Sequence, residues 1–218
     1  MTRILVIVGS PIVGSFNHAL AASYGAAATA GGADVRMIDL ATDPIPAHPT
    51  LRGELRMPRA DHPHDAALAP EVATYMDDIT WADHLVFFYP QWWGTYPAVL
   101  KSFIDRVFLS GFAFRYRPTG RLWDRLLVGR TARVVMTMDS PRAWNRLVYR
   151  NASETSLTRA TLGYCGIRTV GVSRFGEVRH TTLAARERWL RDAARLGTKD
   201  AALRARREHH TGGVAVPV

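Results

Sequence analysis

A short aromatic segment bounded by Pro90 and Gly94 carries the side chains best suited to bind a flat ligand. Between these two residues stand Gln91, Trp92 and Trp93. Indole faces stack on planar rings, a carboxamide can bond a ring edge, and a loop leaves backbone N–H groups free to do the same. The two tryptophans could instead fill the interior, but adjacent aromatic residues in such a turn are difficult to bury together. The segment therefore predicts a site for a planar ring.

A second loop, residues 9–15, has the composition of a phosphate-binding turn. It contains the hydroxyls of Ser10 and Ser15 and ends at a helix start, where the first backbone N–H groups have no partner within the helix. Gly9 and Gly14 have the separation of the Walker A motif, but Ser15 stands where that motif requires lysine, which argues against a P-loop nucleotidase. The alternative is a capped helix start without a ligand, because serine and asparagine are good capping residues.

A third candidate loop follows an apolar run at residues 131–138 and offers the polar side chains of Thr137, Asp139 and Ser140. Asp139 could bond a ring N–H or cap the helix that follows, and the residues alone leave both roles open. All three loops follow apolar runs that are typical of buried strands. In a parallel sheet they would gather at the carboxyl edge, where ligands bind beside a switch point.

The elements that must position these loops alternate between strand and helix. Apolar, β-branched runs predict five buried strands, and helical periodicity predicts helices between them. Gly197 is expected to cap the last helix. The pattern predicts an α/β fold, a flavodoxin-like three-layer sandwich with a five-stranded parallel doubly wound sheet. The predicted strands are residues 3–8, 33–40, 85–89, 131–138 and 167–172, with an exposed strand at 111–116, and the predicted helices are residues 16–28, 66–81, 98–108, 144–162 and 183–196.

Composition narrows the class of protein. We expect one domain over residues 1–200 and a flexible tail at 201–218. The formal net charge of +9 comes from arginines scattered among acids, without a nucleic-acid module, so we expect no nucleic-acid partner. Cys165 is the single cysteine, which excludes a disulfide framework and a thiol zinc cluster.

Two further segments bear on metals and location. The Asp and His run at residues 61–65 is more typical of a solvated loop than of a metal site, so no metal is expected. The apolar run at residues 4–8 is too short to span a bilayer or to form a signal peptide. We therefore expect a cytoplasmic protein without an integral membrane segment.

Three segments carry a resemblance to a known family. They are Ser15, Phe16 and Asn17, the run PQWWGTYPAVLKSFIDRVF at residues 90–108, and GFAF at residues 111–114. In these segments the chain resembles the NAD(P)H:quinone oxidoreductases of the DT-diaphorase type. The resemblance implies a homodimer that passes two electrons from NADH or NADPH through a flavin to quinones, with azo and nitro compounds as further acceptors. FMN is favoured over FAD, because we find no separate adenine-binding segment.

The flavin-binding residues that the resemblance implies come from all three loops. The first loop would hold the flavin phosphate, the aromatic loop would bond and stack the ring, and the third loop would border the ring. These residues are Ser10, Ser15, Phe16 and Asn17, then Pro90, Gln91, Trp92, Trp93 and Gly94, and then Thr137, Asp139 and Ser140.

The third loop departs from the family pattern. Family members usually carry a Thr-x-Gly-Gly run there, followed by tyrosine and histidine, whereas this chain has Thr137, Asp139 and Ser140 and no histidine nearby. A histidine proton relay is therefore not expected, and Trp144 and Tyr149 are the candidates for the catalytic tyrosine's role.

Two other functions fit the same fold. A flavin-binding ancillary subunit of a membrane transporter, such as a potassium-efflux system, could use the basic surface for docking. A flavodoxin-type electron carrier is disfavoured by the net charge of +9, because such carriers are usually acidic.

Overall fold

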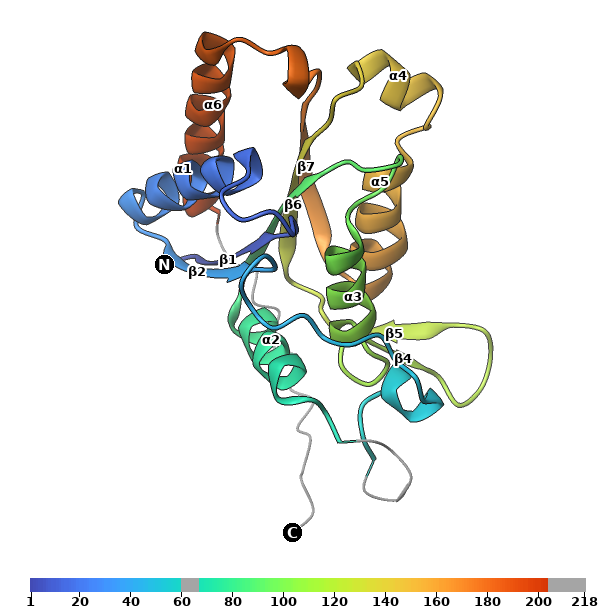
Figure 1. The fold of residues 1–218 in the computed structure, drawn as a ribbon. Coiled ribbons are helices and arrows are strands. Elements are labelled where there is room, and N and C mark those ends of the chain that lie inside the picture. The colour runs from blue at the N-terminus through green and yellow to red at the C-terminus, as the bar shows by residue number, and fades with distance from the viewer. Residues whose placement is uncertain (60–66, 204–218) are drawn as a thin grey trace.

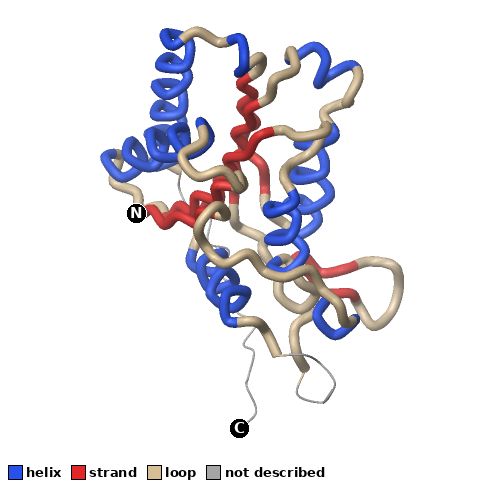
Figure 2. The backbone as a smooth tube through the Cα atoms, viewed as in Figure 1, coloured by secondary structure: helices blue, strands red, loops and turns tan. Residues whose placement is uncertain are grey.

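The central sheet has five parallel strands in the order β2-β1-β3-β6-β7 (Figures 1 and 2). The computed structural model describes residues 1–59 and 67–203. The order of the strands reverses between β1 and β3, which creates the kind of switch point at which α/β sheets bind ligands. The predicted fold class is confirmed. The strands are β1 (Arg3–Val8), β2 (Asp34–Asp39), β3 (His84–Pro90), β6 (Thr131–Thr137) and β7 (Arg168–Phe175).

Helices cover both faces of the sheet, as Figure 1 shows. Alternate residues of the central strands point to the two faces, and both sets are apolar and buried. This double burial explains the unbroken apolar runs of β1 and β3. One face is covered by α1 (Phe16–Ala30) and α6 (Leu183–Ala201), and the other by α2 (Pro70–Trp81), α3 (Ala98–Val107) and the π-helical η2 (Ser156–Gly163), which continues the short α5 (Ala152–Thr155).

Gly197 lies inside α6, so the expected capping role is wrong. The helix continues to Ala201. At Gly197 it passes so close to α1 that a Cβ atom would overlap the Tyr24 carbonyl oxygen and lie 3.1 Å from the Ala28 nitrogen. Glycine at this position therefore permits the close packing of two helices, and the sequence around Gly197 alone contains no sign of the second helix.

A buried charged cluster joins α6 to α1 and the sheet. Asp200 is fully buried and accepts hydrogen bonds from Arg133 at 2.5 and 2.7 Å, from Tyr24 at 2.9 Å and from His84 at 3.2 Å. Burial alone would raise the pKa of Asp200, but the bonds from Arg133 and His84 outweigh it and hold that pKa well below its usual range. We call these four residues the Asp200 cluster.

Several predicted elements have different limits in the structure. The helix expected over residues 144–162 is divided, because Arg150 and Asn151 adopt left-handed conformations with φ near 50° and 55°. The exposed strand expected at residues 111–116 is shorter in the structure, where only Phe114–Tyr116 form a strand, paired antiparallel with Trp123–Arg125. Residues 61–65, where the sequence favours a solvated loop over a metal site, and most of the predicted tail lie outside the described residues. The remaining elements are η1 (Arg52–Leu55), β4 (Phe114–Tyr116), β5 (Trp123–Arg125), α4 (Arg142–Leu147) and η3 (Val178–His180).

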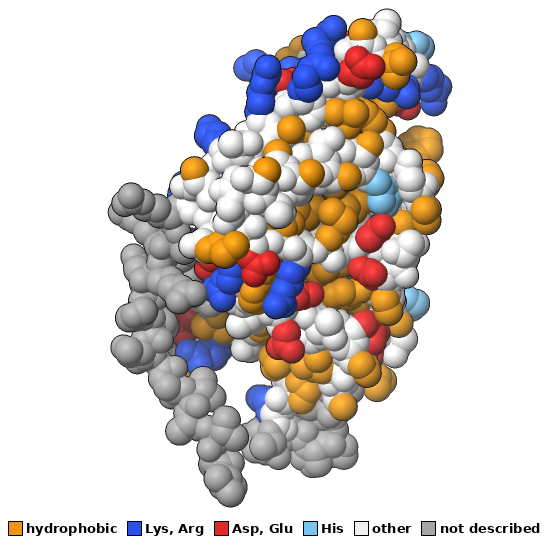
Figure 3. Space-filling model, turned by 90° about the vertical axis from the view of Figure 1, so that its left-hand side faces the viewer, with side chains coloured by type: hydrophobic (Ala, Val, Ile, Leu, Met, Phe, Trp, Pro, Cys, Tyr) orange, Lys and Arg blue, Asp and Glu red, His pale blue; other side chains and the backbone are white. Residues whose placement is uncertain are grey.

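Charge is unevenly distributed on the face shown in Figure 3. Lys and Arg side chains gather at its upper end, the height at which α6 begins in Figure 1, and acidic side chains stand among them. The exposed arginines of α6 include Arg188, Arg191 and Arg195, and Arg195 pairs with Asp192 at 3.0 Å. In the described parts of the chain no helix has both the length and the apolar character needed to cross a membrane.

Candidate functional site

The three predicted loops meet at the carboxyl edge of the sheet, on both sides of the switch point. Gly9 N–H donates to the Phe88 carbonyl of β3 at 2.7 Å, and Gln91 N–H donates to the Thr137 carbonyl of β6 at 2.7 Å. The Asn17 side chain reaches from α1 to the Thr137 hydroxyl at 2.9 Å. Thr137 therefore contacts both the first loop's helix and the aromatic loop, so these residues form one site.

The first loop points its hydroxyls toward each other rather than capping α1. Ser15 is the residue before the helix, but its side chain makes no capping bond. Instead Ser15 Oγ lies 3.1 Å from Ser10 Oγ. The first turn of α1 carries no acidic residue, and the space beside the Gly14 Cα is open. The positive end of the helix is thus left uncompensated beside two hydroxyls, an arrangement that suits an anion.

Two residues that sequence reasoning missed support this loop. His18 Nδ1 lies 2.8 Å from Ser15 Oγ, and His18 Nε2 lies 2.9 Å from Asp39 Oδ1. Asp39 ends β2 and pairs in register with Val8 of β1, so the sheet itself brings it beside the first loop. The spacing of Ser15 and His18, one helical turn apart, was a usable sign, whereas the contact with Asp39 depends on the pairing of β1 with β2.

Asn17 and Phe16 have different environments. Asn17 is buried, and its Oδ1 atom has no hydrogen-bond partner among the described residues. An unpartnered buried polar atom is costly, so a ligand hydroxyl would be a suitable partner at this point. The Phe16 ring packs 6.1 Å from the Trp189 ring of α6, and the Phe16 backbone N–H belongs to the first turn of α1, where it has no partner within the helix.

The aromatic loop is a tight turn that holds its indoles outward. Trp92 and Thr95 exchange two backbone hydrogen bonds of 2.8 and 2.9 Å. Between them Trp93 and Gly94 adopt positive φ angles of 51° and 74°. Trp92 is 40% exposed and Trp93 is 100% exposed. The interior-packing alternative is therefore wrong, because the strained turn directs both indoles away from the core.

Gln91 ties the aromatic loop to the third loop. Its Nε2 donates to Asn145 Oδ1 at 2.7 Å, and its Oε1 accepts from Ser140 at 3.5 Å. Asn145, a fully buried residue of α4 that sequence reasoning missed, also donates to Asn151. The Gln91 amide is thus engaged within the chain, so the loop presents its backbone and its indoles to a ligand.

Asp139 does not cap the helix that follows. Its Oδ1 accepts from the Arg179 backbone N–H at 3.1 Å, and Arg179 also approaches Oδ2 at 3.5 Å. The residue preceding α4 is Pro141, which has no capping side chain. Asp139 therefore links η3 to the end of β6 through Arg179.

Trp144 and Tyr149 stand at the rim of the site. Their rings meet edge to face at 6.4 Å, and both are partly exposed. A Cβ atom on Gly94 would lie 3.6 Å from the Tyr149 ring, so Tyr149 touches the aromatic loop. The contact between Tyr149 and the aromatic loop is visible only in the structure.

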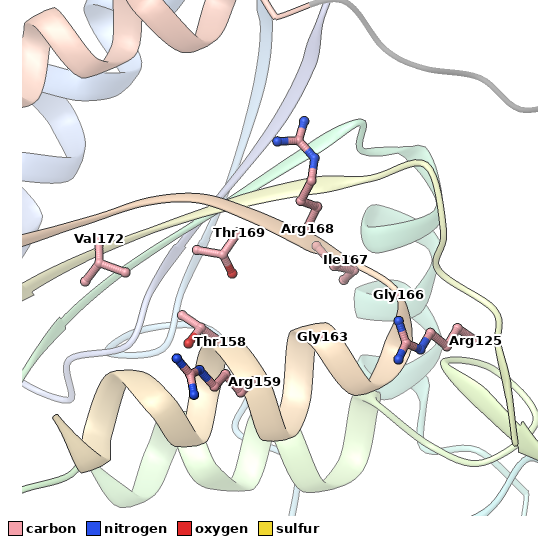
Figure 4. A pocket seen from close by; sticks show the side chains of 9 residues that line it. All are labelled: Arg125, Thr158, Arg159, Gly163, Gly166, Ile167, Arg168, Thr169 and Val172. Carbon is pink, nitrogen blue, oxygen red and sulfur yellow. The ribbon is translucent and has the colours of Figure 1, made fainter. Parts of the chain in front are cut away.

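A separate pocket of about 570 Å³ lies between β7 and η2, near the amino end of β7. Arg125, Arg159 and Arg168 line it, but Figure 4 shows Arg168 and Thr169 on opposite sides of the strand and Arg125 apart from Arg159. Three guanidinium groups that do not converge do not form an anion site. Within the described ranges, no three His, Cys, Asp or Glu residues are grouped closely enough to hold a metal.

Comparison with known proteins agrees with this geometry. A family model described as flavodoxin-like fold matches residues 2–196. NAD(P)H dehydrogenase [quinone] 1 of Cavia porcellus is 32% identical over 127 residues, which cover 53% of this chain and 46% of that protein, so the match spans less than half of that relative. An FMN-dependent NADH:quinone oxidoreductase of Bordetella avium is 29% identical over 141 residues, 64% of this chain and 67% of that protein. The crystal structure of Smu.1420 from Streptococcus mutans is 27% identical, with a TM-score of 0.72, over 91% of this chain and all of that one.

Proposed function

The chain belongs to the flavodoxin-like fold family, and on that premise we propose that it is an FMN-dependent oxidoreductase that passes two electrons from NADH or NADPH to quinones. Azo and nitro compounds are further acceptors of the same class. The observation that carries the proposal is the meeting of a phosphate-type loop and an exposed aromatic loop at Thr137. The two named oxidoreductase relatives support it.

The first loop fits the phosphate of FMN. Ser10 and Ser15 offer hydroxyls, and the first turn of α1 offers backbone N–H groups at the positive end of the helix. Asn17 Oδ1, which lacks a partner, is placed to accept from a hydroxyl of the chain that links phosphate to ring. The first loop offers no charged side chain, so neutral donors and the helix end would hold the phosphate.

The aromatic loop fits the ring. Trp92 offers a partly exposed indole face, and the turn that holds Trp93 and Gly94 leaves their backbone groups accessible. Thr137 and Ser140 offer hydroxyls from the third loop. FMN, when bound, supplies the hydride-accepting ring, and the protein's part is to stack that ring, bond its edge and keep water from it.

The assignment predicts a simple reconstitution result. Apo-protein mixed with FMN should quench the flavin's fluorescence, and the complex should bleach anaerobically with NADH or NADPH and regain its colour when a quinone is added. Steady-state rates with each nucleotide would then identify the donor. A protein that leaves FMN fluorescence unchanged would refute the proposal.

Trp92→Ala is expected to weaken FMN binding about two- to twelvefold, because an aromatic stacking contact contributes about 0.5–1.5 kcal/mol beyond its buried area. The measurement is a fluorescence titration with FMN. Trp81→Ala is the matched control: Trp81 ends α2, where Arg36 lies over its ring at 4.1 Å, and its loss should leave FMN affinity unchanged. Equal weakening in both variants would remove Trp92 from the site.

We also propose a homodimer in which the partner covers this rim. Exposed apolar side chains gather on the first loop, the aromatic loop and the segment around α4, and an apolar surface of this kind is typical of an interface. The resemblance of the central segment supports the same assembly. We call this surface the apolar rim, and its members are Ile12, Val13, Trp92, Trp93, Trp144, Leu147, Val148 and Tyr149.

Trp93→Asp is expected to convert the dimer to monomer, because a charge would replace the fully exposed indole of the apolar rim. Light scattering after size-exclusion chromatography should give twice the chain's mass for the unmodified protein and about one chain's mass for the variant. Met37→Asp is the matched control, since Met37 is an exposed apolar side chain on the edge strand β2. A native protein that elutes as a monomer would contradict the dimer.

A further inference from the structure

Four polar groups form a continuous chain from the first loop to the end of β2. Ser10 Oγ lies 3.1 Å from Ser15 Oγ, Ser15 Oγ lies 2.8 Å from His18 Nδ1, and His18 Nε2 lies 2.9 Å from Asp39 Oδ1. His18 and Asp39 are both largely shielded from solvent, which keeps this geometry intact. Asp39 is held in turn, because its Oδ1 accepts from the Ala41 backbone N–H at 3.0 Å.

The direction of these hydrogen bonds depends on one proton. A carboxylate only accepts, so His18 Nε2 carries hydrogen and donates to Asp39. If His18 is neutral, Nδ1 has a lone pair and accepts from the Ser15 hydroxyl, which then accepts from Ser10. If His18 is protonated, Nδ1–H donates to Ser15 Oγ and the order is reversed. The protonation of His18 therefore determines where the two serine protons point.

That direction matters for a phosphate, because phosphate oxygens only accept hydrogen bonds. With neutral His18, the hydroxyl protons of Ser10 and Ser15 are both engaged within the chain. With protonated His18, Ser15 donates to Ser10, and the proton of Ser10 at the end of the chain is available to a ligand beside the start of α1. Ser10 Oγ also accepts from the Ile12 backbone N–H at 3.4 Å, which leaves its proton as the group that can turn outward.

We propose that His18 is a positioning residue that takes up a proton when a phosphate dianion binds, and so reverses the two serine hydroxyls and turns that of Ser10 toward the phosphate. This inference rests on the proposed function, since the phosphate is that of FMN. The charged group bonded to His18 is Asp39, at the end of β2, and the Asp43 carboxylate accepts from the Asp39 backbone N–H at 2.7 Å. The first loop and the first turn of α1 bring none.

The test compares FMN with riboflavin, which lacks the phosphate, over a pH series. Imidazoles generally titrate near pH 6.5, and a phosphate monoester takes its second proton near pH 6, so the informative range is about pH 6.5 to 9. As the pH rises through this range, FMN should bind about tenfold more weakly while riboflavin affinity stays constant. The reason is that only the phosphate of FMN needs the serine hydroxyls in their reversed direction. Calorimetry in buffers with different ionisation enthalpies should show net proton uptake for FMN alone.

Two variants distinguish the effect of protonating His18 from the effect of having a hydrogen-bond donor at its Nδ1 position. His18→Asn places an amide donor where Nδ1 stood but cannot titrate, so FMN should bind nearly as tightly as at low pH, without the pH dependence. His18→Ala should weaken FMN about tenfold at low pH and leave riboflavin unchanged, because one charge-assisted bond is lost. His48→Gln, at an exposed histidine, is the matched control and should keep the native profile.

Three results would overturn the inference. They are a native pH profile in His18→Asn, an equal loss of FMN and riboflavin affinity in His18→Ala, and FMN binding without proton uptake. If riboflavin and FMN both bind but show one of these results, the role of His18 is refuted and the flavin site stands. If neither flavin binds, the proposed function fails and this inference fails with it.

Discussion

Gly197→Ala is expected to destabilise the protein by about 3 kcal/mol or more, although alanine normally stabilises a helix interior by about 1 kcal/mol relative to glycine. The added methyl group would overlap the Tyr24 carbonyl oxygen and lie 3.0 Å from its carbonyl carbon. These are backbone atoms of α1, so relief requires a shift of the whole helix rather than a side-chain rotation. In a chain of this size the loss corresponds to a fall in Tm of about 6–12 °C.

Gly25→Ala provides the control within the same pair of helices. Gly25 lies inside α1, but a Cβ atom there would meet only Val35 Cγ1, at an ordinary 3.9 Å. This change should leave stability unaltered or raise it by about 0.5–1 kcal/mol through helix propensity. Urea unfolding of both variants gives the comparison. If Gly197→Ala were as stable as Gly25→Ala, the helices would have to cross farther apart than the structure shows.

Asp200→Ala is expected to cost about 3–5 kcal/mol, because it leaves the buried charge of Arg133 without its partner. Tyr24 and His84 lose an acceptor at the same time. Asp192→Ala is the matched control on the same helix, since Asp192 forms an exposed pair with Arg195 and should contribute less than about 1 kcal/mol. Free energies of unfolding from urea titrations distinguish the two.

The Asp200 cluster also makes stability depend on pH. The pKa of Asp200 is lower in the folded chain than in the unfolded chain, where an aspartate titrates near pH 3.9. The unfolded state therefore binds a proton first as the pH falls. The cluster's contribution is complete above about pH 5 and is lost progressively below about pH 4. Asp200→Asn should flatten this acid limb, and an acid limb as steep as the native one would show that other carboxylates account for it.

The loops of the candidate site could be recognised in the sequence because each is local. The apolar run of β3, the proline and glycine around the aromatic loop, and the serines after β1 each occupy a short stretch of sequence. Outward indoles followed from the same local reasoning, because the turn at Trp93 and Gly94 leaves no room to bury both rings. The parallel sheet then places the loop ends at one edge, which is a general property of alternating strands and helices.

Other residues could not be predicted because their partners are distant in the chain. Asn145 accepts a hydrogen bond from Gln91, which lies 54 positions away in the sequence, and Asp39 bonds His18, which lies 21 positions away. Gly197 fits the local pattern of a helix end, and only the approach of α1 shows why the helix continues past it. The helix expected over residues 144–162 was wrong for a local reason, since the left-handed Asn151 donates its N–H to the nearby Asn145 carbonyl at 2.9 Å and turns the chain.

The sequence by itself determined the elements, the loops that end them and the chemical character of those loops, because periodicity, turn residues and functional groups are properties of neighbouring residues. The tertiary structure decided which groups meet. It joined Asp39 and His18 to the serines of the first loop, and it placed Asp200 among residues from α1, β3 and β6. Such contacts depend on strand order and helix packing, which arise only when distant segments bury their apolar faces against one another.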